Sequence, residues 1–321
     1  MVSHWLAELD GRRVTVEVPA SAANLGAGYD CLGLALALTD RIELEVRGWS
    51  RGAIEITVDG EGRDELTEDR DNPFVRGVEA VMRDARGELP EGVGWRLEMR
   101  NEIPLARGLG SSAAATVGGV LAGNALLGDP LPVTRLLELA TEVEGHPDNA
   151  AAALLGGFVV SAEGPGGVVD TVRFDAPRDL RAVLFIPDLR LPTAAMRRAL
   201  PTDVPLEDAV ANLAAVAVGV AGLATGRFEF LRRLTVDRLH EPYRAKVYPQ
   251  LPRMVDAARE AGALGACLSG AGSTILAFAD SMSGITRIEA AFAATAADID
   301  LTGRIAVVKP RNTGAKVLSR T

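Results

Sequence analysis

Apolar and polar positions alternate in short stretches over the first hundred residues of the chain, which is the pattern of half-buried strands. The alternation predicts strands over residues 13–18, 34–38, 42–46, 53–58 and 93–99. An Asn-Pro pair at positions 72 and 73 introduces a predicted helix that ends near residue 86. We therefore expect strands and at least one helix in the first part of the chain.

A run of small apolar residues at 113–127 differs from these strands in length and composition, and it predicts a buried helix. Thr134 is expected to cap the next helix, which ends near Gly145. Pro147 suits the first turn of a further short helix, which the glycines at 156–157 would stop. Three helices thus follow the strand at 93–99.

A Glu-Gly-Pro-Gly-Gly segment at residues 163–167 is the best candidate for a turn between two domains. Beyond it, predicted strands at 180–186, 265–268 and 274–278 alternate with predicted helices at 208–224 and 253–261. Alternation of this kind is typical of α+β or α/β proteins. We predict an α+β chain with an N-terminal domain at 1–167 and a C-terminal domain at 168–321.

Composition and charge narrow the class of protein. A length of 321 residues suits two domains of about 150 residues each. We find no apolar run long enough to span a bilayer and no signal peptide at the N-terminus, so we expect a cytoplasmic protein without a membrane partner. Cys31 and Cys267 are too few for a disulfide framework. A net charge of -9 and an aromatic content of 4% argue against binding to nucleic acid.

The clearest chemical signal is the glycine-rich segment at 104–115, between a predicted strand and a predicted helix. Gly108 and Gly110 allow backbone amides to turn inward, and the hydroxyls of Ser111 and Ser112 stand where they can cap the helix. The start of a helix attracts anions, so the segment predicts a phosphate site. The same pattern also occurs where a strand simply packs tightly onto a helix.

Common nucleotide signatures are absent around this segment. Ser111 follows the last glycine, where the usual phosphate loop has a lysine, and the signatures of protein kinases are missing. Phosphate charge would therefore be met by backbone amides, by a metal ion, or by an arginine such as Arg107.

Three separated motifs, at 19–30, 104–115 and 268–274, together resemble the GHMP small-molecule kinase superfamily. Within it, the segments 144–149, 193–197 and 239–244 are similar to homoserine kinases. The resemblance implies an N-terminal domain like domain 2 of ribosomal protein S5 with a left-handed βαβ crossover, and a ferredoxin-like C-terminal domain. It implies ATP and Mg²⁺ as cofactors and L-homoserine as the substrate, converted to O-phospho-L-homoserine for threonine biosynthesis, and it admits a homodimer.

The resemblance also assigns residues to the nucleotide and the metal. The residues it implies for the nucleotide are Asn72, Pro104, Leu105, Ala106, Arg107, Gly108, Leu109, Gly110, Ser111, Ser112, Ala113 and Ala114. Ser112 and Glu138 would position Mg²⁺, which prefers oxygen ligands. Glu138 could instead be a solvated helix residue, four positions before Glu142, and the Asn72-Pro pair is also an ordinary helix entry.

For the substrate, the resemblance implies that Arg197 and Arg244 grip the carboxylate through their planar guanidinium groups. Asn24 and Asp30 would orient the amino and hydroxyl ends, and His146 would line the pocket. Local backbone bonds are the competing role for Asp30, and a helix cap is the competing role for His146.

The catalytic hypothesis concerns Asp30 and Asn149. Some superfamily members have a catalytic aspartate where this chain has Asn149, and an amide is a poor proton acceptor. A loose phosphoryl-transfer transition state develops little charge on the nucleophile, so positioning can supply most of the rate. We expect Asp30 to hold and polarise the hydroxyl and Asn149 to support the geometry.

Other functions remain open at this point. Another GHMP kinase, acting on mevalonate, shikimate or a sugar, would share the glycine motifs, although paired arginines favour a carboxylate. A nucleotide-binding regulator that has lost catalysis is a second alternative, and the presence of Ser112, Glu138 and Asp30 argues against it. A nucleic-acid-binding module conflicts with the acidic net charge.

Overall fold

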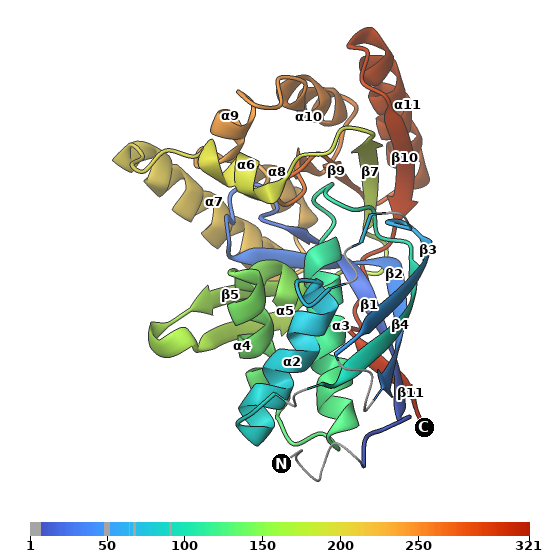
Figure 1. Ribbon diagram of the computed structural model, residues 1–321. Coiled ribbons are helices and arrows are strands. Elements are labelled where there is room, and N and C mark those ends of the chain that lie inside the picture. Colours follow the sequence, from blue (N-terminus) through green and yellow to red (C-terminus); the bar gives the residue numbers. More distant parts are fainter. Residues whose placement is uncertain (1–7, 48–51, 64, 67–68, 90–91) are drawn as a thin grey trace.

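The computed structural model describes residues 8–47, 52–63, 65–66, 69–89 and 92–321, and two sheets organise it (Figure 1). The segment on which the signal-peptide prediction rests, 1–7, lies outside the described residues. The larger sheet has the order β11-β1-β2-β4-β3, and β5 pairs with both β2 and β6. Its strands are β1 (Arg13–Ala23), β2 (Leu32–Arg47), β3 (Ile54–Gly60), β4 (Gly94–Asn101), β5 (Phe158–Glu163), β6 (Val169–Phe174) and β11 (Lys316–Arg320).

The two strands predicted at 34–38 and 42–46 are one continuous strand, β2. Thr39 and Asp40 do not form a turn, because they pair with Pro19 and Val18 of β1 across a register shift. A bulge of this kind lets a long antiparallel pair bend without ending. β1 ends at Ala23, and Asn24 begins the loop that follows it at the end of this strand pair.

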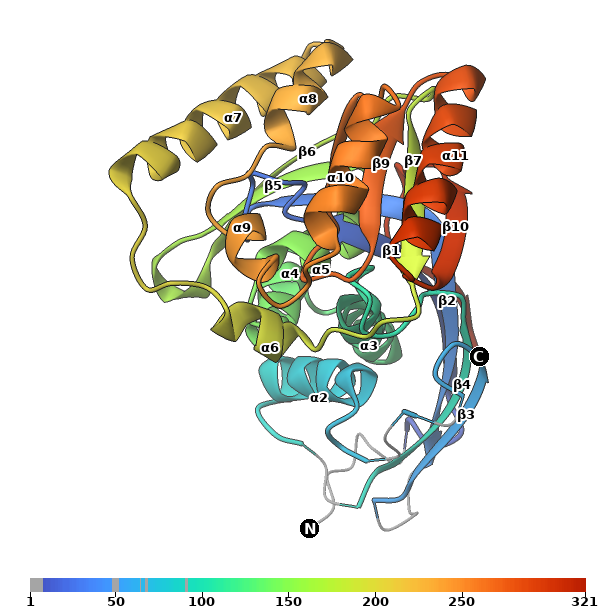
Figure 2. The same ribbon diagram turned by 90° about the horizontal axis from the view of Figure 1, so that it is seen from above.

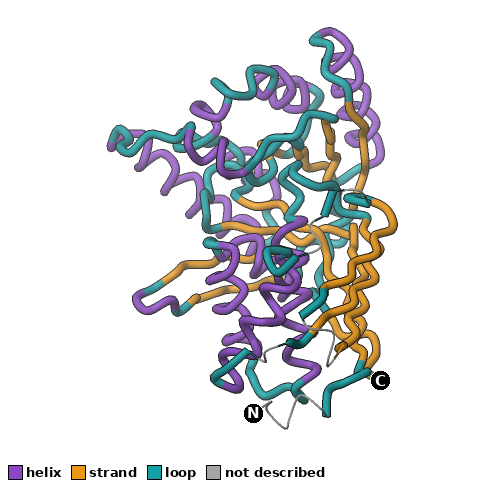
Figure 3. The backbone as a smooth tube through the Cα atoms, in the orientation of Figure 1, coloured by secondary structure: helices purple, strands orange, loops and turns teal. Residues whose placement is uncertain are grey.

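Helices cover one face of this sheet, as the tube view also shows (Figure 3). They are α2 (Pro73–Arg86), α3 (Ser111–Leu126), α4 (Val133–Glu144) and α5 (Pro147–Leu155). β3, α2 and β4 form the predicted βαβ unit, with β3 and β4 parallel. α3 is buried and lies close to α2, since a Cβ atom on Gly119 would be 2.0 Å from the carbonyl oxygen of Phe74. The helix that begins at the glycine-rich loop is therefore firmly held.

The second sheet is antiparallel with the order β10-β7-β9-β8. Its strands are β7 (Arg181–Pro187), β8 (Gly265–Leu268), β9 (Ile275–Ala279) and β10 (Gly303–Val308), and α10 (Leu251–Glu260) and α11 (Met282–Asp298) lie side by side on it (Figure 2). Strand, helix, two strands, helix and strand in this order are the ferredoxin-like arrangement. The predicted fold class is thus confirmed.

The two sheets share a continuous core. Alternate side chains of β7 point to opposite faces, as in any strand. Ala182, Leu184 and Ile186 join the core of the N-terminal domain, and Val183 and Phe185 pack toward α10 and α11. This packing fixes one domain against the other and so fixes any cavity between them.

The remaining helices follow β7 and precede α10 along the chain. They are α6 (Thr193–Arg198), α7 (Leu206–Ala224), α8 (Leu231–Leu234) and α9 (Glu241–Arg244), with a short 3₁₀ helix at Phe228–Phe230. By length and composition alone, α7 is long and apolar enough to cross a membrane, which corrects the sequence-based statement that no such run exists.

Two further sequence predictions are wrong. Residues 163–167 do not separate domains, because they turn between β5 and β6, and both strands belong to the larger sheet. The chain changes sheet between β6 and β7 and returns to the larger sheet with β11, so the boundary at 167/168 does not hold. Thr134 does not cap α4, since Pro132 occupies the cap position.

Candidate active site

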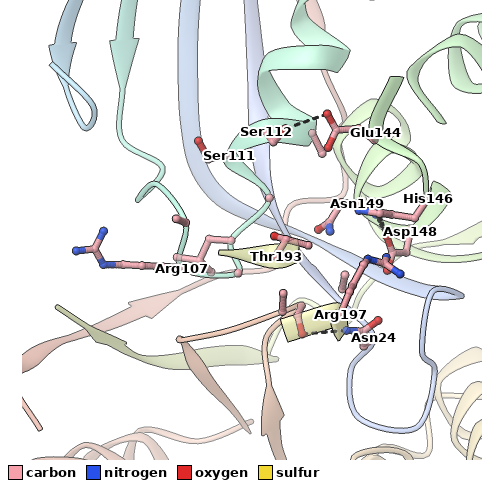
Figure 4. A pocket seen from close by; sticks show the side chains of 18 of the residues that line it. Asn24, Arg107, Ser111, Ser112, Glu144, His146, Asp148, Asn149, Thr193 and Arg197 are labelled. Atoms are coloured by element: carbon pink, nitrogen blue, oxygen red, sulfur yellow. Dashed lines mark hydrogen bonds and ion pairs between the residues drawn. The ribbon is translucent and has the colours of Figure 1, made fainter. Parts of the chain in front are cut away.

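A cavity of about 250 Å³ lies between the two domains (Figure 4). The N-terminal domain contributes the glycine-rich loop, the start of α3 and the start of α5, and the C-terminal half contributes α6, α9 and the loop between β8 and β9. Its lining residues are Ala23, Asn24, Asp30, Pro104, Ala106, Arg107, Gly108, Leu109, Gly110, Ser111, Ser112, Ala113, Glu144, His146, Asp148, Asn149, Thr193, Arg197, Arg244, Gly270 and Ala271. Most of the site residues predicted from the sequence therefore meet in one place.

The start of α3 faces this cavity without a side-chain cap. Gly110 occupies the cap position with a φ of 72°, and no side chain accepts a hydrogen bond from the first turn there. The predicted capping by Ser111 and Ser112 is wrong, because both residues lie inside the first helical turn. First-turn amides without a capping side chain, at the positive end of the helix dipole, form an anion site.

A second loop holds the glycine-rich loop in place. Ser269 Oγ donates to the carbonyl oxygen of Gly108 at 2.6 Å. The backbone amide of Thr274 donates to the carbonyl oxygen of Arg107 at 3.1 Å. Gly108 has a φ of 71°, and a Cβ atom added there would be 2.0 Å from the carbonyl oxygen of Ser269. Only glycine fits this contact between the two domains.

Replacing Gly108 by alanine tests this contact. We expect Gly108→Ala to lower the free energy of unfolding by about 2 kcal/mol or more, since the positive φ is strained and the Cβ atom meets backbone. Gly128→Ala is the matched control, because Gly128 has a φ of 81° and nothing within 4 Å of its Cβ position. Urea unfolding of both variants measures the difference, and equal losses would contradict the close contact.

Arg107 does not direct its charge into the cavity. Its Nε donates to the carbonyl oxygen of Pro187 at 2.8 Å, and its Nη atoms donate to those of Leu105 and Asp188. In Figure 4 its guanidinium group points away from the other labelled side chains. The structure therefore does not support the predicted role of Arg107 in balancing phosphate charge.

Three other residues assigned to the nucleotide do not line the cavity. Leu105 and Ala114 are absent from its walls. Asn72 caps α2, accepting a hydrogen bond from the amide of Phe74 at 3.0 Å, so the helix-entry alternative is the one the structure shows.

The carboxylate beside Ser112 is that of Glu144. Ser112 Oγ donates to Glu144 Oε1 at 3.0 Å, and Thr116 donates to the same oxygen atom. Glu138 lies elsewhere, with its Oε2 2.9 Å from Arg135 Nη1 in an ion pair, and it does not line the cavity. The structure thus places Glu144, and not the predicted Glu138, beside Ser112. Glu144 ends α4 directly before Gly145, which brings it to the start of α3.

At the opposite end of the cavity, Asp30 and Arg197 bind each other. Arg197 Nη1 and Nη2 donate to the two oxygens of Asp30 at 2.9 and 2.8 Å. The Asp30 backbone has a φ of 52°, and its amide donates to Asn24 Oδ1 at 3.0 Å. Asn24 in turn donates to the carbonyl oxygen of Gly270 at 2.9 Å. This bonding places the Asp30 carboxylate at the cavity wall and commits both terminal nitrogens of Arg197.

Arg244 is the second arginine of this end, and it is almost completely buried. Its Nη1 donates to the carbonyl oxygen of Gly270 at 2.8 Å and to His240 Nδ1 at 3.0 Å. No hydrogen-bond acceptor among the described residues reaches its Nε, and burial lowers its pKa. A buried cation in the wall of a cavity is suited to an anionic ligand.

His240, to which the sequence analysis assigned no role, fixes this arginine. Because Arg244 only donates and the Gly26 carbonyl oxygen only accepts, His240 is neutral, with its proton on Nε2 and a 2.8 Å bond to Gly26. Burial lowers the pKa of His240 to about 4, which keeps it neutral at physiological pH. Residues 239–241, shortly before Arg244, form no sequence pattern from which this role of His240 could be predicted.

Glu241, next to His240 in α9, makes the stability of the folded chain depend on pH. Burial raises its pKa to about 8, and its Oε1 accepts a hydrogen bond from the amide of Leu268 at 2.7 Å. Between pH 4.5, the ordinary pKa of a glutamate side chain, and about 8, the folded chain keeps a proton that the unfolded chain has lost. The free energy of unfolding then falls as pH rises through this window, by at most about 1.4 kcal/mol per pH unit.

We therefore expect Glu241→Gln to unfold with a weaker pH dependence than the parent between pH 5 and 8. The amide retains the acceptor for Leu268 and has no proton to lose. Urea unfolding at several pH values measures the slopes, and Glu260→Gln, on the exposed end of α10, is the control. Parallel slopes for all three proteins would contradict a protonated Glu241.

The start of α5 supplies the last group of polar side chains. Asp148 Oδ1 lies 2.9 Å from His146 Nδ1 and accepts from the amide of Asn149 at 2.7 Å. Burial alone would lower the pKa of His146, but its hydrogen bond to Asp148 and the charge of that carboxylate raise it overall. Asn149 Oδ1 accepts from Ser21 Oγ at 2.8 Å, which fixes the amide at the cavity wall. His146 occupies the cap position of α5, but its side chain accepts no hydrogen bond from the first turn, so the competing role as a side-chain cap is not formed.

The fold and this site define a small-molecule kinase, and matches to known families agree. The GHMP kinases N terminal domain model matches residues 72–157, and the GHMP kinases C terminal model matches residues 220–298. Kinases of this class use ATP as phosphoryl donor.

Relatives that match most of this chain at higher sequence identity are named homoserine kinase. A homoserine kinase from Moorella thermoacetica is 46% identical over 82% of this chain and 86% of its own, and one from Caldicellulosiruptor bescii is 39% identical over 95% and 97%. The crystal structure of homoserine kinase from Cytophaga hutchinsonii superposes with a TM-score of 0.83, at 31% identity over 95% of this chain and 97% of the other. The chain belongs to the homoserine kinase family of the GHMP kinases.

Proposed function

We propose that this enzyme transfers the γ-phosphoryl group of ATP to the side-chain hydroxyl of L-homoserine, forming O-phospho-L-homoserine for threonine biosynthesis. The observation that carries the proposal is the two-ended cavity. An anion site at the start of α3 lies at one end, and Asp30, Arg197 and Arg244 lie at the other. We also propose that the enzyme is cytoplasmic, as expected from the sequence.

The arginine end suits an amino acid. Arg244 lines the cavity, and in this proposal its guanidinium group binds the substrate carboxylate. Asp30 supplies a carboxylate for the substrate ammonium or hydroxyl, and Arg197 holds Asp30 in place while lying beside the same ligand. A neutral sugar would leave the charge of Arg244 without an anion, which is costly for a buried group.

The other end suits a triphosphate with Mg²⁺. Ser112 Oγ and Glu144 Oε1, 3.0 Å apart, are both oxygen donors of the kind Mg²⁺ binds. These two residues fit the metal and would hold it at the start of α3, where it would neutralise phosphate charge. The glycine-rich loop contributes amides to the same phosphates.

Between the two ends, this chain aligns the hydroxyl. Asn149, fixed by Ser21, lies at the cavity wall but cannot accept a proton, and Asp30 polarises the hydroxyl in this proposal. The new bond joins the substrate oxygen to the γ-phosphorus, the bond to the β-phosphate oxygen breaks, ADP leaves, and the hydroxyl proton is released to water. A loose transition state places little charge on the attacking oxygen, so alignment matters more than a strong base.

Release of ADP from ATP and Mg²⁺ tests the proposal, with L-homoserine beside mevalonate, shikimate, galactose and a reaction without acceptor. We expect turnover with L-homoserine only. Turnover with another acceptor would retain the kinase and overturn the substrate. Binding of ATP without turnover on any acceptor would favour a regulator that has lost catalysis.

A further inference from the structure

Helix α7 buries a polar amide although it exposes two leucines. Asn212 is 3% exposed, whereas Leu206 and Leu213 on the apolar outer side of the helix are 80% and 71% exposed. A buried amide is costly unless its polar atoms are hydrogen-bonded. The contacts of Asn212 therefore show why the residue stands on the inner side of α7.

The side chain of Asn212 bonds to two segments that are distant from each other in the chain. Its Nδ2 donates to the carbonyl oxygen of Ala27 at 3.0 Å and to Asp237 Oδ1 at 2.7 Å. Its Oδ1 accepts from the amide of Arg238 at 2.9 Å. Ala27 lies in the loop between β1 and β2, and the other two residues lie shortly before α9. A single amide group thus connects this loop to α9.

The loop between β1 and β2 depends on outside support. Leu25 and Asp30 in this loop have φ values of 50° and 52°, which is the left-handed region. A leucine stays in this region only where surrounding contacts hold it. The carbonyl oxygens at 26–27 accept hydrogen bonds from His240 and Asn212 in turn. The C-terminal half therefore holds the loop in the form that presents the Asp30 carboxylate to the cavity.

Asp237 orders the segment on the other side of Asn212. Its carboxylate is fully buried and also accepts from the backbone amides of residues 239–241, at distances between 2.7 and 3.1 Å. Bonds from several amides to one carboxylate are charge-assisted, and they fix the start of a helix. These bonds therefore set the position of His240 and, through its Nδ1, that of Arg244.

We infer that Asn212 and Asp237 form a positioning pair, which holds the loop that carries Asp30 and the helix α9 in the one arrangement that suits the acceptor substrate. Neither residue lines the cavity, so the pair acts through Asp30 and Arg244. The inference rests on the proposed function, in which these two side chains bind L-homoserine. The start of α3, assigned to the phosphates, is not among the bonding partners of Asn212, so we expect no effect on ATP.

Asn212→Ala tests the inference, because alanine removes all three hydrogen bonds of the amide. Asn124→Ala is the matched control, since Asn124 is 4% exposed on α3 and bonds through both Oδ1 and Nδ2 to Leu131. Asn124 lies near the end of α3 opposite to the cavity and does not line it. Both variants lose the buried hydrogen bonds of one side chain, so both should unfold at lower urea concentrations than the parent.

Initial rates of ADP release, with L-homoserine and ATP varied in turn, measure the effect on each substrate. We expect Asn212→Ala to raise the KM for L-homoserine about tenfold and to keep the KM for ATP within about twofold of the parent. Asn124→Ala should keep both KM values within about twofold. Because both variants are destabilised, a rise confined to L-homoserine in Asn212→Ala reports positioning and not damage to the fold.

Asp237→Asn is the second variant. It has nearly the volume of the parent side chain but only one accepting oxygen, so the start of α9 loses bonds and the KM for L-homoserine should rise about tenfold. It decides the inference if Asn212→Ala does not fold. An unchanged KM for L-homoserine in a folded variant, or an equal rise in the KM for ATP, would overturn the inference. If the parent phosphorylates another acceptor instead, the proposed substrate fails, and the KM for that acceptor supports or overturns the positioning pair in the same way.

Discussion

Glu144→Gln is expected to lower kcat by about 10²- to 10³-fold, because it removes the carboxylate charge that stands beside Ser112 at the phosphate end of the cavity. Glutamine has nearly the same shape and can still accept the hydrogen bonds of Ser112 and Thr116. The loss should therefore come from charge and metal affinity, with little change in fold. Initial rates of ADP release at several Mg²⁺ concentrations measure it.

Glu138→Gln is the matched control for this prediction, since it makes the same chemical change on the same helix. Glu138 is paired with Arg135 outside the cavity, so we expect its kcat to stay within about twofold of the parent. The apparent affinity for Mg²⁺ should fall in Glu144→Gln only. If Glu138→Gln were the inactive variant, the site built around Ser112 and Glu144 would be wrong.

The second large effect concerns Arg244. We expect Arg244→Lys to lower kcat/KM for L-homoserine by about 10²- to 10³-fold, because one ammonium group cannot keep the bonds to His240 and Gly270 and also replace the planar guanidinium group at the cavity wall. The KM for ATP should change little, since the nucleotide is assigned to the opposite end of the cavity. Steady-state kinetics with each substrate varied in turn separates the two effects.

Two controls distinguish substrate recognition from damage to the fold. Arg238→Lys makes the same change at an exposed arginine that is paired with Asp208, and it should behave as the parent. 3-Aminopropan-1-ol, which is homoserine without its carboxylate, should be an equally poor acceptor for the parent and for Arg244→Lys. A loss of the same size on this amino alcohol would show that Arg244 does not act through the substrate carboxylate.

Local signals in the sequence were sufficient for many elements of the fold. The predicted strand at 265–268 coincides with β8, and the helix predicted to about residue 86 is α2. Gly145 and Gly156 end α4 and α5 as expected, because each adopts the positive φ that ends a helix most easily. The terminal strand β11 carried no clear signal, and only its pairing with β1 makes it part of a sheet.

Local motifs likewise predicted one part of the site, and the other part depends on tertiary packing. Motifs local in sequence placed Ser112, Asp30, Arg197 and Arg244 correctly at one cavity. The choice between Glu138 and Glu144 was not local, since both lie on α4. Six residues along a helix correspond to about 9 Å of rise and roughly 240° of rotation. Which carboxylate reaches Ser112 thus depends on how α4 packs against α3.

By itself, the sequence pointed to the glycine-rich loop, to most of the polar side chains that line the cavity and to the family, because each rests on residues close together in the chain. Only the tertiary structure decided which groups are partners. It bonded Arg197 to Asp30, turned Arg107 onto backbone carbonyls, buried Arg244 against His240, and left the apolar side of α7 exposed. Such pairings join distant segments, as between Asn24 and Gly270, which are 246 residues apart, and they follow from packing that no local pattern encodes.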